Sequence, residues 1–313
     1  MAAPRRLKEL ADTINQRSRF PDPPHLIALS GGADSAALAF IADRASGTKP
    51  RCVHVHHGLP GSDRLSLAAR EIAEVLDMAC DVVSVDVPEG ASPEAMARAA
   101  RYRALEGAVA DDESLLLGHT RNDQAETVLL NLIRGAGIRG LSGMPYQRTA
   151  HMYRPFLEVT RDETRELATL LRLPFVDDPT NSDLSMRRNF VRVELIPRME
   201  ELNPNLVDSL ARTAEHLRGD SEFLDQLRPF PIITDGETAS AATGILLTLD
   251  PPLRARAVAA LVGSFREMAA VSAAELARVE EVLTGASSAA ELEGGLTVTK
   301  RGAYLVVTPG TAR

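Results

Sequence analysis

A short glycine motif, Ser30 to Ser35 (SGGADS), carries the clearest chemical signal in the sequence. An apolar run, Leu26 to Leu29, precedes it, and an alanine- and leucine-rich segment follows from about Asp34, which predicts a strand, a tight turn and a helix. Glycines let the backbone approach a bound group closely, and the free N–H groups at a helix start attract anions. The motif therefore predicts a phosphate site to which the hydroxyls of Ser30 and Ser35 add donors.

The motif lacks the lysine of the Walker phosphate loop, since Lys8 is the only lysine before Lys49. It resembles instead the PP-loop, the S-G-G-x-D-S signature of enzymes that cleave ATP to AMP and pyrophosphate. This resemblance implies that Asp34 holds Mg²⁺ or the phosphates themselves. It also implies ATP binding by Ser30, Gly31, Gly32, Ala33, Asp34 and Ser35. The alternative is a plain glycine turn between a strand and its helix.

A second set of polar residues lies in the segment that begins at Gly118. If a helix begins near Asn122, its buried stripe consists of Ala125, Val128, Leu129 and Leu132. Asp123 and Glu126 then lie side by side on the exposed face, close to a strand end that opens onto the same crevice as the glycine motif. Two carboxylates there can hold an ammonium group or a phosphate-bound metal, or simply complement the helix dipole.

Arginines gather in three segments, 98–103, 134–139 and 187–198. Helical spacing places Arg98 and Arg101 on one face and Arg188 and Arg192 on another. A solvated charged face is the alternative explanation for the first pair. The net charge of −8 argues weakly against a protein that coats nucleic acid by bulk electrostatics, but a few local arginines suffice to contact a small region of RNA.

The elements that must position these residues alternate along the chain. Strands are expected at 26–29, 51–57, 80–87 and 114–117, with helices between them, which is typical of a doubly wound, mostly parallel α/β sheet. The second strand ends in His54, His56 and His57. Metal ligation by these histidines is disfavoured because no carboxylate cluster adjoins them, so we expect this strand end to border a nucleotide pocket.

The chain of 313 residues is long enough for about two domains. The composition shifts to proline, threonine, serine and glycine between residues 228 and 244. We therefore expect a catalytic domain at 1–217, a linker region at 218–244 and a small domain with two helices and a hairpin at 245–313. No apolar run is long enough to span a membrane and no secretory leader is evident, so we expect a cytoplasmic protein.

Seven segments carry a more specific resemblance. They are SGGADS, HVHHGL, SPEAMARAARYRAL, GHTRNDQAETVLLNLIRGAGIRGLSGM, RPFLEVTRDE, DDPTNSDLSMRRNFVRVELIP and ELNPNL. Their order and spacing resemble the bacterial tRNA(Ile)-lysidine synthetase family, strongly from Ile27 to about Leu217 and faintly beyond. One position departs from the family pattern R-N-x-I-R-H, because Val193 replaces the usual histidine.

This resemblance implies an ATP- and Mg²⁺-dependent ligase that joins L-lysine to C2 of the wobble cytidine of tRNA(Ile) with a CAU anticodon. The expected products are lysidine, AMP and pyrophosphate, formed through an adenylated cytidine. The implied fold is the PP-loop, adenine nucleotide α-hydrolase-like sheet with a small mixed α+β substrate-recognition domain. The implied site residues are catalytic Asp34, His119, Asp123 and Arg192, metal-binding Asp34, lysine-binding Asp123 and Glu126, and tRNA-binding Arg98, Arg101, Arg134 and Arg188.

Other functions compete with this one. A PP-loop tRNA thiolase is disfavoured because Cys52 and Cys80, the only cysteines, form no C-x-x-C motif. An amidating synthetase is disfavoured because the chain shows no glutaminase module. A nucleotide-binding protein without turnover stays open, although the carboxylate pair favours catalysis. The sequence also leaves open whether the protein is a monomer or a homodimer.

Overall fold

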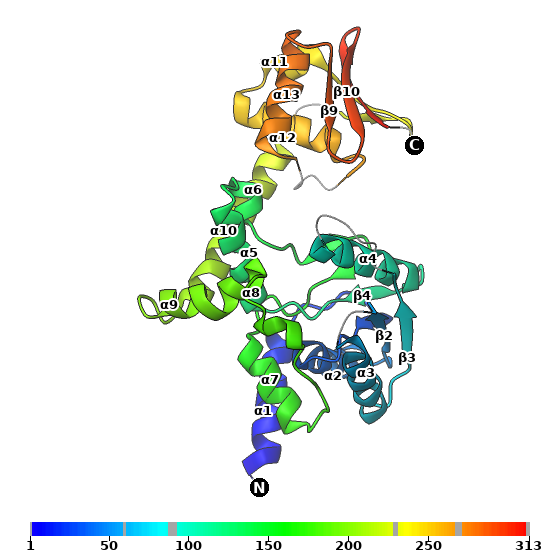
Figure 1. Ribbon diagram of the computed structural model, residues 1–313, viewed down its shortest axis with the longest axis vertical. Coiled ribbons are helices and arrows are strands. Elements are labelled where there is room, and N and C mark those ends of the chain that lie inside the picture. Colours follow the sequence, from blue (N-terminus) through cyan, green and yellow to red (C-terminus); the bar gives the residue numbers. More distant parts are fainter. Residues whose placement is uncertain (1, 59–60, 87–92, 228–230, 267–270, 311–313) are drawn as a thin grey trace. The chain divides into compact units, whose positions relative to one another are not determined.

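The computed structural model describes residues 2–58, 61–86, 93–227, 231–266 and 271–310. They divide into two compact units (Figure 1). The first comprises Met1–Gly137 and Leu141–Glu215, and the second comprises Ile138–Gly140 and His216–Arg313. Among the described helices, none combines the length and the apolar character that crossing a membrane requires.

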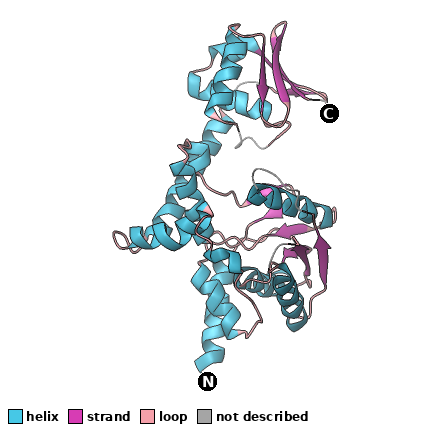
Figure 2. Ribbon diagram, viewed as in Figure 1, coloured by secondary structure: helices cyan, strands magenta, loops and turns pink. Residues whose placement is uncertain are grey.

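The first unit is built on a six-stranded sheet with the order β3-β2-β1-β4-β6-β5. Figure 2 colours the strands magenta and the helices cyan. Its strands are β1 (His25–Ala28), β2 (Arg51–His56), β3 (Cys80–Ser84), β4 (Ser114–Leu116), β5 (Gln147–Thr149) and β6 (Met152–Tyr153). All neighbouring strands pair in parallel except β5 and β6. The mostly parallel α/β sheet expected from the alternating pattern is confirmed.

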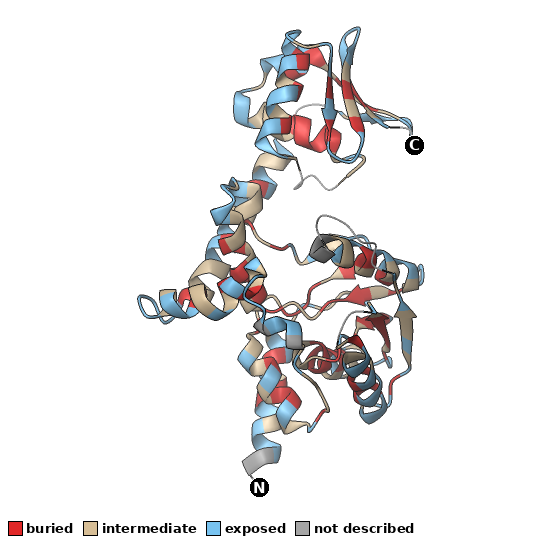
Figure 3. Ribbon diagram, in the orientation of Figure 1, coloured by how far each residue is buried: buried red, intermediate tan, exposed pale blue. Residues whose placement is uncertain are grey.

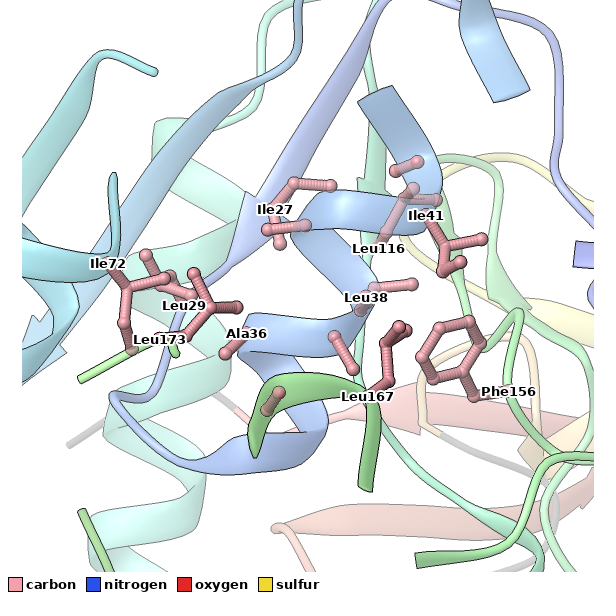
Figure 4. Packing of buried hydrophobic residues seen from close by; sticks show 14 of the residues in the cluster. Ile27, Leu29, Ala36, Leu38, Ile41, Ile72, Leu116, Phe156, Leu167 and Leu173 are labelled. Atoms are coloured by element: carbon pink, nitrogen blue, oxygen red, sulfur yellow. The ribbon is translucent and has the colours of Figure 1, made fainter. Parts of the chain in front are cut away.

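Helices lie on both faces of this sheet. They are α1 (Ala2–Arg17), α2 (Ala33–Ser46), α3 (Ser62–Val75), α4 (Pro93–Ala108) and α7 (Arg161–Leu170). The helix α5 (Arg121–Ile133) follows β4 and packs against a later helical stretch. On one face, Ile27 and Leu116 pack against Leu38 of α2 and Leu167 of α7 (Figure 4). On the other face, Leu26 packs in a cluster with Tyr102 and Leu105 of α4. Because both faces are covered, the middle residues of the central strands are buried (Figure 3).

A further helical stretch completes the first unit after α7. It consists of a 3₁₀ turn, η1 (Pro179–Ser182), then α8 (Arg187–Phe190), a π-helical turn, η2 (Val191–Leu195), and α9 (Ile196–Glu200). Val191 and Ile196 of this stretch pack against Leu129 of α5 and Leu206 at the start of α10 (Leu206–Gln226). This packing holds the basic helical segment beside α5.

The second unit contains a five-stranded antiparallel sheet in the order β7-β8-β11-β10-β9. Its strands are β7 (Ile233–Thr234), β8 (Ala239–Ala242), β9 (Ala289–Leu292), β10 (Leu296–Arg301) and β11 (Tyr304–Pro309). The helices are α6 (Ile138–Leu141), which begins in this unit, α11 (Thr243–Thr248), α12 (Pro251–Val262) and α13 (Ala273–Thr284). The two helices and the hairpin expected near the end of the chain are confirmed.

The segment 218–244, which the sequence suggested as a linker, contributes to the second unit. It supplies the last turns of α10 and the strands β7 and β8. Ala239 and Ala241 of β8 are buried in the core of that unit, because alternate residues of a strand face the same side. The boundary between the two units lies at residues 215 and 216, within α10.

Candidate active site

The glycine motif forms the turn that joins β1 to α2. Gly31 has a φ of 87°, and a side chain there would overlap the backbone of Leu65, so both conformation and space require glycine. The hydroxyl of Ser35 accepts a hydrogen bond from the Ser30 N–H (3.1 Å) and donates one to the Gly32 carbonyl (3.0 Å). Gly32, the N-cap, supplies no side chain to the first turn of α2. The N–H groups of that turn can therefore bind an anion.

A pocket of about 500 Å³ lies beside this turn. All residues of the glycine motif except Gly31 line it. Its other walls include His54 and His57 from the end of β2, Gly118 and His119 after β4, Arg101 of α4, Asp123 of α5, and Arg161 and Arg192. The ends of β1, β2 and β4 therefore converge on one cavity, as expected for a ligand site at the carboxyl edge of a parallel sheet.

Asp34 is a partly exposed carboxylate in this pocket. It accepts a hydrogen bond from the Thr164 hydroxyl, and Nε of Arg161 lies 3.9 Å from its Oδ2. Desolvation raises the pKa of Asp34 to about 6, despite the opposing effect of the Thr164 hydrogen bond. Because desolvation disfavours the ionised form, a bound cation would stabilise the Asp34 carboxylate.

Asp123 has both carboxylate oxygens occupied. Oδ2 accepts hydrogen bonds from the backbone N–H (2.8 Å) and hydroxyl (3.0 Å) of Thr120, which close a capping box at the start of α5. Oδ1 accepts from Arg161 and Arg188, each at 3.1 Å. Burial alone would raise the pKa of Asp123, but the positive charges of Arg188 and Arg161 hold it well below its ordinary value. Asp123 is therefore an ionised group.

Glu126 lies one turn further along α5 and is fully buried. Its oxygens accept hydrogen bonds from Arg192 Nε (2.7 Å), Arg188 Nε (2.8 Å) and Arg161 Nη2 (3.0 Å). We call Asp123, Glu126 and these three arginines the carboxylate–arginine cluster. Its three positive and two negative side chains leave one positive charge in excess.

The prediction that Asp123 and Glu126 share an exposed face is wrong. Asp123 is 7% exposed and Glu126 0%, whereas Leu132, expected in the buried stripe, is 55% exposed. The reason is that arginines from three separate segments compensate the carboxylates, so that this face of α5 can be buried. A prediction from the amphipathic pattern alone places every carboxylate on the solvent-facing side of the helix.

The helical segment after η1 places two of these arginines as the sequence suggested. Arg188 and Arg192 lie four residues apart and both donate to Glu126. Arg192 belongs to the π-helical turn η2, a geometry that is rare and frequently found at functional sites. Arg192 lines the pocket, and Arg188 contacts the same carboxylates behind it.

Three histidines border the pocket with ring nitrogens that have no hydrogen-bond partner among the described residues. These nitrogens are His54 Nε2, His57 Nδ1 and His119 Nδ1. Desolvation lowers the pKa of all three, and that of His119 falls well below its ordinary value. Neutral imidazoles that lack partners can accept or donate hydrogen bonds to a bound ligand.

The remaining predicted residues lie apart from the pocket. Arg134 is exposed at the end of α5, and Arg98 contacts Tyr102 on α4. Sequence reasoning missed Arg161 and Thr164, which reach Asp34 from α7. The helix α7 begins with a capping box formed by Thr160 and Glu163. This local role accounts for the polar residues at the helix start, so the sequence held no separate sign of a functional site there.

The fold and the glycine turn together define a PP-loop ATP-binding protein, and a family model described as a PP-loop domain matches residues 3–199. The tRNA(Ile)-lysidine synthase of Salinispora tropica is 43% identical over 93% of this chain and 93% of its own length. The tRNA(Ile)-lysidine synthase of Streptomyces coelicolor is 39% identical over 92% of this chain and 86% of its own. The chain belongs to the tRNA(Ile)-lysidine synthase family of ATP-dependent ligases.

A solved structure shares the fold. The U34-tRNA thiolase NcsA from Methanococcus maripaludis, with its [4Fe-4S] cluster, superimposes with a TM-score of 0.54. The match covers 67% of this chain and 78% of the thiolase at 19% identity. At this identity the likeness concerns the fold alone.

Proposed function

We propose that this protein joins L-lysine to C2 of the wobble cytidine of tRNA(Ile) with a CAU anticodon, at the expense of ATP cleavage to AMP and pyrophosphate. The observation that carries the proposal is that the glycine turn, with Asp34, meets Asp123, Arg161 and Arg192 at one pocket. Membership of the tRNA(Ile)-lysidine synthase family supplies the reaction. The pocket supplies the groups that such a reaction needs.

The glycine turn would bind the pyrophosphate end of ATP. Its backbone N–H groups and the hydroxyl of Ser30 point a partial positive charge at the phosphates. The cytosine O2 would then attack the α-phosphorus, the bond to pyrophosphate would break, and an adenylated base would form. Arg161 and Arg192 line the same pocket and bring the excess positive charge of the cluster to the phosphate that becomes more negative.

The residues present fit a magnesium ion. Mg²⁺ is usually bound by one or two carboxylates together with substrate phosphates rather than by a full set of protein ligands. Asp34 supplies one carboxylate. Desolvation raises its pKa, so a bound cation would stabilise its ionised form. When bound, Mg²⁺ would neutralise charge on the pyrophosphate that leaves.

Lysine must reach the adenylated base as a neutral amine, because an ammonium group is not a nucleophile. Asp123 is an ionised group with a strongly lowered pKa, which suits a partner for a charged amine better than a proton acceptor. His119 is a neutral imidazole with an unpartnered Nδ1 in the same pocket, so it can accept a hydrogen bond from the amine. Because desolvation lowers the pKa of His119, we propose that it orients the neutral amine and that the proton passes to solvent. The amine then bonds to C2 and AMP leaves.

Glu126 was expected to bind lysine beside Asp123. All its hydrogen bonds in this structure come from arginines, and it does not line the pocket. Lysine could contact Glu126 only after an arginine moved away. We therefore propose that Glu126 positions Arg161 and Arg192, and that Asp123 is the carboxylate nearest the lysine.

The RNA would be held by arginines, with Arg98, Arg101, Arg134 and Arg188 as the proposed contacts. Arg101 lines the pocket and is the best placed of them to contact the reacting nucleotide. Because the proposed substrate is a tRNA, we propose a cytoplasmic location. A homodimer stays a prediction, which sedimentation of the purified protein would check.

One experiment tests the proposed reaction. The protein is incubated with ATP, Mg²⁺ and radiolabelled lysine, together with an isoleucine tRNA transcript bearing CAU. We expect label in the tRNA and one AMP released for each lysine incorporated. A transcript with uridine at the wobble position is the matched control and should stay unlabelled. AMP release without lysine incorporation, or with another amine or sulfur donor, would redirect the proposal.

A further inference from the structure

Four arginines surround the ring of Tyr102 beside the candidate active site. The guanidinium carbon of Arg148 lies 3.9 Å from the ring centroid, and those of Arg98 and Arg101 lie at 5.0 and 5.5 Å. Arg154, which follows β6, is the fourth and interacts with the Tyr102 side chain. Tyr102, Arg98, Arg101, Arg148 and Arg154 are here named the tyrosine–arginine cage. Two of its arginines come from α4 and two from the strands β5 and β6 or their ends.

Two members of the cage are buried. Tyr102 is 5% exposed, and its hydroxyl accepts a hydrogen bond from Arg98 Nη2 (3.2 Å). Arg154 is 3% exposed, donates to the Pro145 carbonyl (2.7 Å) and leaves its Nε buried without a partner. A buried guanidinium with an unpartnered donor costs free energy. An anion bound there would remove that cost.

Three arginines of the cage, Arg98, Arg101 and Arg154, differ in their surroundings from the arginines of the carboxylate–arginine cluster. Among the side chains that the structure describes, no carboxylate forms an ion pair with Arg98, Arg101 or Arg154. The pKa of Tyr102 reflects the positive charges of the surrounding arginines. Burial raises the pKa of Tyr102, but the surrounding arginines outweigh burial and bring that pKa down to about 8.

The cage adjoins the pocket through Arg101, which belongs to the cage and also lines the pocket. His119, another lining residue, interacts electrostatically with both Arg154 and Arg101. The glycine turn at the start of α2 and Arg101 of the cage on α4 therefore border one cavity.

We propose that the tyrosine–arginine cage binds one phosphate group of the RNA, next to the nucleotide that enters the pocket. The inference rests on the proposed function, which makes the substrate an RNA. Arginine binds phosphate through paired hydrogen bonds, and phosphate contacts set the position of a nucleic acid. Tyr102 is a positioning residue, because its ring holds the guanidinium groups by cation–π contacts.

The test compares Arg148→Gln with Arg103→Gln. Arg103 is an exposed residue of the same helix α4 outside the cage, so its substitution removes the same charge without removing a cage contact. Affinity for the tRNA is measured by fluorescence anisotropy at several salt concentrations. We expect Arg148→Gln to raise Kd roughly tenfold and to reduce the slope of log K against log salt by about one. Arg103→Gln should leave the slope unchanged.

Two variants of the tyrosine separate stacking from simple loss of a hydroxyl. Tyr102→Phe keeps the ring and should bind tRNA almost as the wild type does. Tyr102→Leu removes the cation–π contacts and should reproduce the effect of Arg148→Gln. Thermal unfolding of each variant shows whether it has folded, and Arg148→Gln answers the question alone if Tyr102→Leu does not fold.

The remaining outcomes decide where the phosphate comes from. An increase in KM for ATP with unchanged tRNA affinity would assign the cage to the nucleotide and overturn the proposal. Unchanged affinity and salt slope in Arg148→Gln would overturn it as well. The wild-type protein could bind tRNA but form no lysidine, while the variants lose tRNA affinity as expected. That result would support the cage as a phosphate site and refute the proposed reaction.

Discussion

The glycine turn and the carboxylate–arginine cluster meet at one pocket but are built in opposite ways. The turn uses backbone N–H groups and two hydroxyls from six consecutive residues, and only Asp34 brings a charge to it. The cluster uses five charged side chains from α5, α7, α8 and η2, which are brought together by folding. The turn is ready to receive an anion, whereas the cluster is already saturated by its own ion pairs.

This difference separates two tasks. A site made of backbone donors costs little to leave empty, because water can satisfy exposed N–H groups. A buried set of charges is tolerated only when each charge has partners, so its members hold one another in place. We infer that the turn binds ligand directly and that the cluster keeps Arg161 and Arg192 oriented toward it.

The largest expected effect comes from removing the one charge of the turn. Asp34→Ala should lower the rate of ATP-dependent lysine incorporation about a thousandfold, because a cation at the pyrophosphate loses its carboxylate. AMP release measured by chromatography follows the first step. Asp34→Glu is the matched control, since it keeps the charge and moves it by one methylene. An Asp34→Ala variant with wild-type activity would remove Asp34 from the mechanism.

Substitutions in the carboxylate–arginine cluster should mainly lower the free energy of unfolding. Glu126→Gln leaves three arginines around a neutral side chain, and breaking a buried ion pair in this way costs about 3 kcal/mol of unfolding free energy. Urea unfolding measures the change. Glu9→Gln removes an exposed carboxylate that pairs with Arg5, so it should cost less than about 0.5 kcal/mol. Equal effects of the two substitutions would show that the cluster is not held by its charges.

The same contrast explains how much the sequence could predict. The strand, the glycines and the helix start of SGGADS are consecutive, so local rules predicted the turn and its ligand. Helical spacing supplied the pairs Asp123 with Glu126 and Arg188 with Arg192, and the resemblance supplied the roles of Asp123 and Arg192. Neither could reveal that Arg161 joins them, because its position near Asp34 depends on how α7 packs on α2. Burial of Glu126 was missed for the same reason.

A third prediction uses pH to test whether the surroundings of Asp34 favour or disfavour its ionised form. The pKa of Asp34 is about 6 in the folded protein, above its ordinary value of 3.8. Between these values the folded protein keeps a proton that the unfolded chain has lost, so stability falls as the pH rises through this window. Asp34→Asn removes this effect.

Ligand-free Asp34→Asn should therefore be more stable than the wild type by about 2 kcal/mol at pH 8 and equally stable near pH 4. Urea unfolding at both pH values, without ATP or Mg²⁺, measures the difference. Stability equal to that of the wild type at pH 8 would mean that Asp34 is well solvated. If Asp34→Asn is more stable than the wild type but inactive, the Asp34 carboxylate lowers the stability of the protein and is required for its activity.

The smallest expected effect concerns Asp123, the one carboxylate of the cluster that also lines the pocket. If it contacts lysine, Asp123→Asn should raise KM for lysine roughly tenfold, the loss of one charge-assisted hydrogen bond, while KM for ATP stays the same. Steady-state rates at varied lysine and at varied ATP measure the two constants.

The control for Asp123→Asn must separate its charge from its structural role in the capping box. Thr120→Val removes the hydroxyl that donates to Asp123 Oδ2 but keeps the carboxylate charge and the backbone hydrogen bond. It should lower stability slightly and leave KM for lysine unchanged. A parallel rise in both KM values in Asp123→Asn would instead assign Asp123 to the orientation of Arg161. The cluster would then act on ATP alone, and lysine would have to bind through His119 and other walls of the pocket.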